Sequence, residues 1–427
     1  MIIPAIIKIL VIFGLIMILN RLRLNLGLAL FMGAFVLGLW MDLGLVDLAK
    51  GGLNSLSSAQ TISLILVVYL IMLMSSIMEK SGHMGRLVKS FSLLSKDGRT
   101  VGSVMTALIG LLPMPGGALF SAPMVEASLP NGSVSREQKT AVNYWFRHIW
   151  EYWWPLYPGV ILAVALLEVE TWHFMVAMAP MTLVSILAGI FFILRPIGNA
   201  ERNSESSISW SRIKQFIWEM VPILIVIAVI VVVTGLIGIL RLMGYNVETP
   251  SLLPILPGLV ISIIWVCAIN HTPFSQFRSV LMSKGILTML LMIVAIMFFN
   301  GIMEASDIVV HIRNELMTYG IPAILLILIM PFLSGFVLGL SIGFVGASFP
   351  LIIPLFQSPD IVEYLSFAAL AYVFGYMGMM LSPVHLCLLV TKDYFKASLF
   401  DSYRYILKTA LTVMATAVIL FSIVRMI

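Results

Sequence analysis

The sequence is poor in charged residues. Only 25 Lys+Arg and 20 Asp+Glu occur among 427 residues, which is 11%, whereas 60% of the residues are hydrophobic. A water-soluble domain is usually about a quarter charged, because its surface must face water. The mean hydropathy of +1.07 therefore excludes a soluble enzyme and a disordered chain. The small positive net charge reflects few charges and not a basic face, so nucleic acid is not an expected partner. The composition predicts a polytopic membrane protein.

Several motifs are also missing. The two cysteines, Cys267 and Cys387, lie in apolar runs, which argues against a disulfide framework or a metal cluster. The six histidines show no HExxH or paired-ligand spacing, and there is no GxGxxG or P-loop fingerprint. We therefore expect no metal, no cofactor and no enzyme activity. The run 2–19 lacks a basic segment and a cleavage site, so we interpret it as a retained span.

Long apolar stretches dominate what is present. Each is long enough to cross about 30 Å of hydrocarbon, and we predict an all-α fold with ten full spans. The predicted spans are 2–20, 28–46, 60–79, 140–168, 171–194, 215–237, 252–269, 284–303, 361–390 and 404–426. Two further stretches, 101–128 and 321–356, contain Pro- or Gly-rich breaks and predict re-entrant hairpins, which membranes tolerate where protein or water covers them.

The chain contains an internal repeat. The segment starting at Ile77 (IMEKS) matches the one starting at Ile302 (IMEAS), at an offset of 225. Two further matches follow in order: Ser121-Ala122-Pro123 with Ser348-Phe349-Pro350, and Tyr144-Trp145-Phe146 plus Pro155 with Tyr372-Val373-Phe374 plus Pro383. The offsets are 227 and 228. We predict a first repeat at 1–194, a linker at 195–214 and a second repeat at 215–427.

The basic residues predict an orientation. Under the ten-span assignment 18 Lys and Arg residues fall on one side and 3 on the other, and the basic side is the cytoplasmic one. The N-terminus is then outside and the linker 195–214 cytoplasmic, in a multi-pass protein of the inner (plasma) membrane. The assignment of sides is consistent only if hairpin 101–128 opens to the cytoplasm and hairpin 321–356 opens to the outside. The two repeats are then inverted.

Inverted repeats with broken helices are typical of alternating-access carriers. Candidate substrate-binding residues are Gly116, Gly117 and Ser121 at the first hairpin tip, and Ser348 at the second, whose tip we place at 343–348. Pro155 and Pro158 interrupt one span and Pro383 another. A proline inside a helix frees a backbone carbonyl, which could line a ligand site.

The segment 143–151 (NYWFRHIWE) holds charges within a predicted span. Arg147 suits an anion because of its donor fork, and Asn143 lies one turn before it. Glu151 lies four residues after Arg147, so the two can pair. The alternative is a self-neutralising pair that only orients the helix, with the tryptophans as interfacial anchors. His148 and Glu151 are candidates for carrying a coupling proton.

In the second half the equivalent stretch is uncharged. It offers Tyr372, Tyr376, Ser382 and His385, of which we assign Ser382 to substrate binding and His385 to coupling. The predicted site is cationic on one half and neutral polar on the other.

The hairpin motif 112–123 (LPMPGGALFSAP) and the motif 143–148 (NYWFRH) resemble an uncharacterised prokaryotic family of ten-span membrane proteins within the ion transporter superfamily of secondary carriers. The resemblance covers nearly the whole chain. It implies a scaffold domain and a moving transport domain, a homodimer and elevator motion. Symporters of that group bind sodium at Ser-Asn-Thr tips, where this chain has Gly116-Gly117-Ala118 and Gly346-Ala347-Ser348, so both H⁺ and Na⁺ remain open as coupling ions.

The leading interpretation is a secondary active transporter of a small organic anion. An inorganic ion transporter or exchanger, in which Arg147 is only structural, is the main alternative. A lipid flippase, an intramembrane enzyme and a channel are further alternatives. The spans carry no paired-His, paired-Asp or nucleophile motif, which argues against the enzyme.

Overall fold

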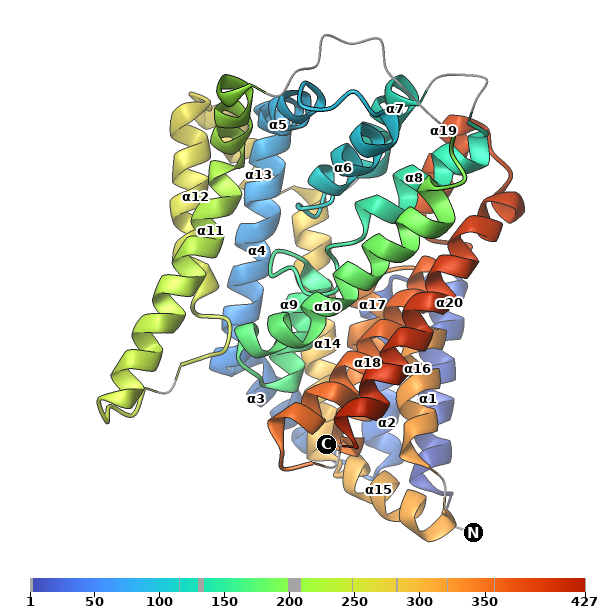
Figure 1. Cartoon of the computed structure of the whole chain (residues 1–427). Helices are drawn as coiled ribbons and strands as arrows, with labels where there is room; N and C mark the ends of the chain where they lie inside the picture. Colours follow the sequence, from blue (N-terminus) through green and yellow to red (C-terminus); the bar gives the residue numbers. More distant parts are fainter. Residues whose placement is uncertain are drawn as a thin grey trace.

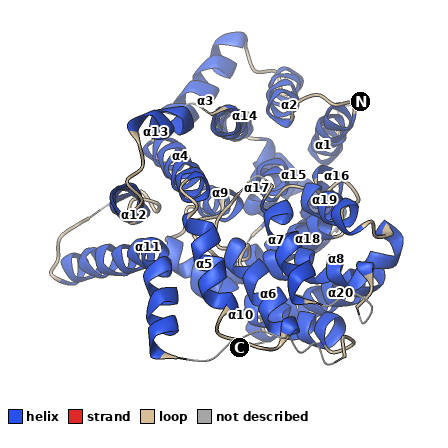
Figure 2. Ribbon diagram, turned by 90° about the horizontal axis from the view of Figure 1, so that it is seen from above, coloured by secondary structure: helices blue, strands red, loops and turns tan. Residues whose placement is uncertain are grey.

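The computed structural model describes residues 3–114, 116–129, 134–198, 209–247, 249–281, 283–320, 322–356 and 358–426. These residues form helices joined by short turns, and no strand occurs among them (Figure 2). The predicted all-α class is confirmed.

The first half of the chain contains ten α-helices in its described part. They are α1 (Ala5–Arg21), α2 (Leu26–Trp40), α3 (Leu45–Ser57), α4 (Ala59–Lys80), α5 (His83–Ser92), α6 (Gly98–Ile109), α7 (Gly117–Ser128), α8 (Arg136–Arg147), α9 (Pro158–Leu167) and α10 (Thr171–Gly189). A short π-helical segment, Ile190–Leu194, extends α10.

The second half has ten α-helices of its own in the described residues. They are α11 (Trp210–Leu242), α12 (Ile255–Ile269), α13 (Phe274–Leu281), α14 (Lys284–Ala305), α15 (Ile308–Tyr319), α16 (Ala323–Leu338), α17 (Ser341–Ile352), α18 (Ile361–Met380), α19 (Leu386–Phe395) and α20 (Leu399–Val424). A 3-10 turn, Ile353–Leu355, follows α17. Helix α11 begins inside the stretch expected to be linker, and residues 199–208 of that stretch lie outside the described part.

Among the described residues, six helices are long and apolar enough to cross a membrane. They are Ala59–Lys80, Thr171–Leu194, Trp210–Leu242, Phe274–Ala305, Ile361–Met380 and Leu399–Val424. At three other predicted spans the helices are shorter: α1, α2 and α12 have 17, 15 and 15 residues. The structure thus has the form of a polytopic membrane protein.

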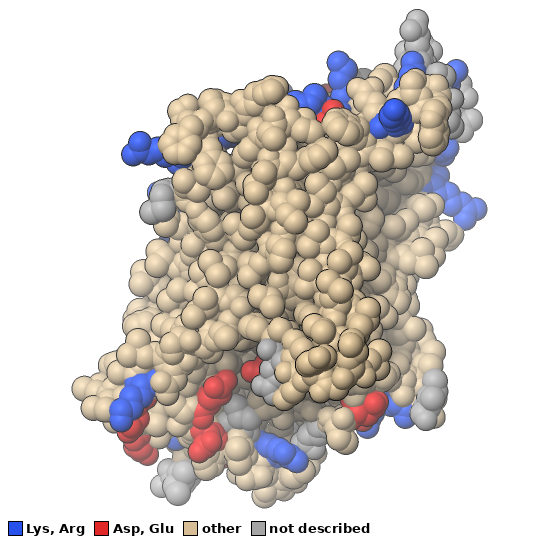
Figure 3. Space-filling model, turned by 90° about the vertical axis from the view of Figure 1, so that its left-hand side faces the viewer, with Lys and Arg blue, Asp and Glu red and all other residues tan. Residues whose placement is uncertain are grey.

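The charges of the molecule separate along its long axis. In the space-filling view Lys and Arg gather at the upper end, and Asp and Glu, mixed with some basic residues, gather at the lower end (Figure 3). The face between these ends is largely uncharged. An apolar middle with charged ends is what a bilayer requires.

The two predicted hairpins are present as pairs of packed helices. Helix α6 packs against α7 after a turn at 110–116, and α16 packs against α17 after a turn at Gly339–Leu340. Helices α6 and α7 lie toward the end that holds α5, whereas α16 and α17 lie toward the end that holds α15 (Figure 1).

Both spans expected to contain prolines are broken. The stretch 140–168 divides into α8 and α9, separated by irregular residues 148–157, and Pro158 is the first residue of α9. The stretch 361–390 divides into α18 and α19, separated by residues 381–385 that include Pro383. Proline lacks a backbone donor and is accepted at the first helical position, which explains why α9 starts at Pro158. Helix α19 starts at Leu386, three residues after Pro383.

Candidate functional site

The first helix break satisfies the carbonyls of the first hairpin. The last carbonyls of a helix have no partner within the helix, and in lipid they need one. Aromatic donors from the break supply it: Trp150 Nε1 to the Ala107 carbonyl at 2.9 Å, Trp154 Nε1 to the Leu111 carbonyl at 2.9 Å, and the Tyr157 hydroxyl to the Gly110 carbonyl. These tryptophans therefore hold the end of the first hairpin.

The carbonyls of the break itself are also occupied. The Tyr376 hydroxyl donates to the His148 carbonyl at 2.5 Å, and the Tyr372 hydroxyl donates to the Glu151 carbonyl at 2.8 Å. Both tyrosines belong to α18. We expected proline-freed carbonyls to be available to a ligand, but at these two positions the other half of the chain takes them.

Arg147 is the last residue of α8 and is only 4% exposed. Its Nη2 donates to the Met114 carbonyl at 3.1 Å, while Nε and Nη1 have no hydrogen-bond partner among the described residues. The guanidinium lies against the first residue of α7, because a Cβ added to Gly117 would lie 2.5 Å from Nη2. Arg147 and the first hairpin tip are thus in contact, as the sequence predicted.

The expected Arg147–Glu151 pair does not form. In the part of the chain that the structure describes, no carboxylate oxygen lies within 4.0 Å of the Arg147 guanidinium, and the Glu151 Oε1 lies 3.8 Å from Nε2 of His148 instead. The reason is that α8 ends at Arg147. The spacing of one helical turn therefore does not continue to Glu151.

Asn143 faces the same hairpin one turn before Arg147 and is fully buried. Its Nδ2 donates to the Ala118 carbonyl at 3.0 Å and to the Thr391 Oγ1 at 2.9 Å, so it joins α7 to α19. Its Oδ1 has no partner among the described residues. The site therefore offers unpaired donors from Arg147 and an unpaired acceptor from Asn143, which fits an anion that also carries a donor.

Ser382 and His385 lie in the second helix break. The Ser382 Oγ donates to the Phe336 carbonyl at 2.6 Å, which ties the break to α16. The His385 Nδ1 lies 3.1 Å from the Tyr144 hydroxyl and 3.2 Å from the Met379 carbonyl. The rings of His385 and His148 are 5.0 Å apart, so the two breaks meet.

Two predicted serines donate to carbonyls of their own helices. The Ser121 Oγ bonds to the carbonyls of Gly117 and Ala118, and the Ser348 Oγ donates to the Phe344 carbonyl at 2.6 Å, each within its own helix. The second hairpin turns at Gly339, whose φ is +63°, so the expected tip at 343–348 is wrong. Ser348 lies inside α17, where its hydroxyl has a helical carbonyl as partner.

Three residues of the site were not predicted. Tyr144 donates to the Met380 carbonyl at 2.9 Å, Thr391 holds Asn143, and Cys387 lies beside Arg147 and both histidines. Tyr144 stood in the quoted motif 143–148, and Cys387 follows His385 by two residues. The sequence contains nothing that marks Thr391, because its role depends on α19 packing beside α8.

A polar cavity of about 710 Å³ opens near the other end of the second hairpin. Its polar lining residues come from both halves: Asn54, Ser55, Ser58, Gln60, Glu168, Asn300, Glu304 and Tyr364. Pro350 and Pro354 at the end of α17 also line it, whereas Arg147 does not. The cavity brings polar groups to the end of the molecule that holds α3 and α15 (Figure 1).

The fold and the site define an all-helical polytopic membrane protein with a buried cationic side chain where two interrupted helices meet. The chain belongs to the family described as "Protein of unknown function (DUF401)", whose model matches residues 5–424. No curated protein matches the sequence. The family description names no activity, so the relation to the ion transporter superfamily stays a prediction.

Proposed function

We propose that the protein is a secondary active transporter of a small organic anion and that Arg147 contacts the anion. The observation that carries the proposal is that Nε and Nη1 of Arg147 have no hydrogen-bond partner among the described residues. A charged group at membrane depth costs at least about 2.5–3.5 kcal/mol, and buried charges are normally paired. Two free donors of Arg147 beside the hairpin tip are therefore an incomplete interaction, which a bound carboxylate would complete.

An inverted repeat of ten spans supports alternating access. Helices pack in exchanged pairs: α2 against α14 and α12 against α4, α1 against α15 and α11 against α5, α7 against α19 and α17 against α9. Suppose that α1–α10 correspond to α11–α20. Exchanging the two halves then converts the contact of α2 with α14 into that of α12 with α4, and it relates the other two couples of contacts in the same way. The two hairpins at opposite ends of the molecule fit the same relation.

The close contacts of two glycines support the repeat at the atomic level. A Cβ on Gly110 would clash with the Arg147 carbonyl, and a Cβ on Gly335 would clash with the Gly375 carbonyl. Gly335 follows Gly110 by 225 residues, and Gly375 follows Arg147 by 228. The same backbone approach thus occurs between corresponding positions, and Arg147 is the position where the halves differ in charge.

We further propose the following arrangement. The hairpins and interrupted spans form the moving part of an elevator, and the other helices form the scaffold of a homodimer in the plasma membrane.

The end rich in Lys and Arg is cytoplasmic by the positive-inside rule, which puts the N-terminus outside. The polar cavity then opens to the outside and is a route for water and solute toward the second hairpin. Coupling uses H⁺ or Na⁺, with His148, Glu151 and His385 as the candidate coupling groups.

An inorganic anion could accept hydrogen bonds from the free Arg147 donors as well as an organic one. The free Asn143 acceptor favours a substrate that also donates a hydrogen bond, as hydroxy or amino acids do. A flippase, a channel or an intramembrane enzyme would not need the unpaired Arg147.

Ligand-induced thermal stabilisation of the purified protein tests the proposal. Carboxylates, hydroxy acids, amino acids, phosphate and inorganic ions are screened against wild type, Arg147→Ala and Arg136→Ala. Arg136 is the exposed first residue of the same helix and serves as the matched control. We expect an organic anion to raise the melting temperature of wild type and Arg136→Ala but not of Arg147→Ala. A full shift in Arg147→Ala, or no shift by any anion in wild type, overturns the proposal.

A further inference from the structure

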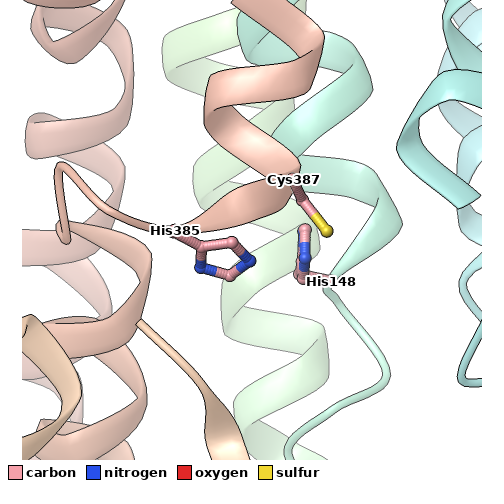
Figure 4. A group of neighbouring side chains, drawn as sticks. All are labelled: His148, His385 and Cys387. Carbon is pink, nitrogen blue, oxygen red and sulfur yellow. The ribbon is translucent and has the colours of Figure 1, made fainter. Parts of the chain in front are cut away.

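Three metal-ligating side chains meet at the two helix breaks. One nitrogen each of His148 and His385 and the sulfur of Cys387 all lie within 4.8 Å of one another. His148 follows α8 directly, whereas His385 and Cys387 stand at the beginning of α19, and the three side chains point toward one another (Figure 4). Residues 237 positions apart in the chain thus form one cluster.

The backbone orients both imidazoles for metal binding. The His148 Nδ1 lies 2.6 Å from the Tyr144 carbonyl, and the His385 Nδ1 lies 3.2 Å from the Met379 carbonyl. A carbonyl only accepts, so each Nδ1 carries the proton and each Nε2 keeps a free lone pair. Metal-bound histidines are held in this way, with the second ring nitrogen donating to a backbone carbonyl or a carboxylate.

The donor set selects the class of metal. Imidazole and thiolate together favour zinc-like or copper(I) ions over magnesium and calcium, which prefer oxygen ligands. In a tetrahedral zinc site with bonds of about 2.0–2.3 Å, the donor atoms stand roughly 3.3–3.7 Å apart. The three side chains therefore need to close by about 1 Å, which small side-chain rotations provide, and a fourth position stays open.

The charges around the cluster can accommodate a divalent ion. Metal binding would deprotonate the Cys387 thiol and so supply one negative charge, and the carboxyl group of Glu151 lies 3.8 Å from Nε2 of His148. The Arg147 guanidinium beside Cys387 adds a positive one.

We propose that His148, His385 and Cys387 bind one transition-metal ion of the zinc class, which links the first helix break to the beginning of α19. Nothing in the sequence marks this site, because the three residues have no metal-ligand spacing and Cys387 lies in an apolar run. The metal is assigned from the geometry of the cluster, independently of the transported solute.

Cobalt(II) titration of the purified protein tests the site directly. Tetrahedral cobalt with a thiolate ligand gives intense visible bands and a thiolate charge-transfer band. We expect one equivalent to produce both in wild type and in Cys267→Ser, whose cysteine lies on α12 and serves as the matched control. Cys387→Ser should lose the charge-transfer band, and His148→Asn or His385→Asn should weaken binding at least tenfold. Absence of the bands in wild type, or their retention in Cys387→Ser, overturns the proposal.

A second measurement does not depend on the folding of ligand variants. In the Cys267→Ser protein Cys387 is the single thiol, and its alkylation by a small uncharged maleimide is followed with and without zinc(II). We expect zinc to slow the labelling at least tenfold and a chelator to restore it, while magnesium has no effect. Equal labelling rates with and without zinc would show that the cluster holds no metal, and His148 and His385 would then remain candidates for proton coupling only.

Discussion

The Tyr376 hydroxyl donates a hydrogen bond of 2.5 Å to the carbonyl of His148, and Tyr376 is the residue that matches His148 at the 228-residue offset. Positions that correspond in the two halves therefore touch each other where the two interrupted spans cross. A contact between equivalent residues is expected close to the axis that relates two repeats. Under the proposed repeat, His148 and Arg147 lie close to that axis.

Removal of that hydroxyl should destabilise the protein. Tyr376→Phe removes the shorter of two hydrogen bonds to the buried His148 carbonyl, which keeps only the Glu151 backbone N–H at 3.3 Å, and the loss of one such bond costs about 0.5–1.5 kcal/mol. We expect a lower melting temperature in thermal unfolding of the detergent-purified protein. Tyr319→Phe, at an exposed position on α15, is the control and should leave the melting temperature unchanged. Equal behaviour of the two variants would show that the bond contributes nothing.

Gly117 should be essential for the anion site although it has no side chain. An added methyl group would lie 2.5 Å from the Arg147 Nη2, so Gly117→Ala must displace the guanidinium. We expect any stabilising anion to bind at least tenfold more weakly, which is about 1.4 kcal/mol. Gly235→Ala is the control, because a methyl group at that position in α11 meets no atom within 4 Å. Undiminished anion binding in Gly117→Ala would show that the hairpin tip is not part of the anion site.

The two halves should expose opposite ends of the molecule. Arg136 and Asp360 begin the corresponding helices α8 and α18, and both are exposed, whereas Lys139 is buried and unsuitable for labelling. Arg136→Cys and Asp360→Cys are made in a Cys267→Ser/Cys387→Ser background. We expect an impermeant thiol reagent applied to intact cells to label position 360 and not position 136. Labelling of both from the same side would contradict the inverted repeat.

An ion pair between Glu170 and Arg241 should make stability weakly dependent on pH. Partial burial raises the pKa of Glu170, but hydrogen bonds from Arg241 and Trp172 lower it more, so the net pKa lies below its ordinary value of 4.5. The pair therefore stabilises the fold above pH 4.5 and loses this effect as the pH falls through the lowered pKa. Because both side chains are at least 36% exposed, the effect should stay below about 1 kcal/mol. In Glu170→Gln the melting temperature should fall less steeply with acid, and identical slopes would contradict the pKa shift.

Much of the fold could be predicted from the sequence, because apolar length and proline position act locally. The helix pairs at 101–128 and 321–356 and the breaks near Pro158 and Pro383 are where the residues placed them. The turn of the second hairpin was misplaced by several residues. In the sequence, Gly339 alone marks the turn. Gly343, Gly346 and Ser348 suggested a break, but α17 continues through them as a regular helix.

The site was only partly predictable. Arg147 at the first hairpin tip follows from its place in a span and from the Gly116-Gly117 motif. The pairing of Arg147 with Glu151 assumed a continuous helix, and the end of α8 at Arg147 removes that assumption.

The amino-acid sequence by itself determined that the protein is helical and apolar, that its spans are interrupted, and that one arginine is buried at depth. Composition, run length and the missing donor of proline act over a few residues and need no knowledge of the fold. Only the tertiary structure decided which groups meet. It brought His385 and Cys387 to His148, bonded the break carbonyls to tyrosines from the other half, and left Arg147 without a carboxylate partner among the described residues. Those outcomes depend on how α8 and α19 pack, which joins residues that lie more than two hundred positions apart.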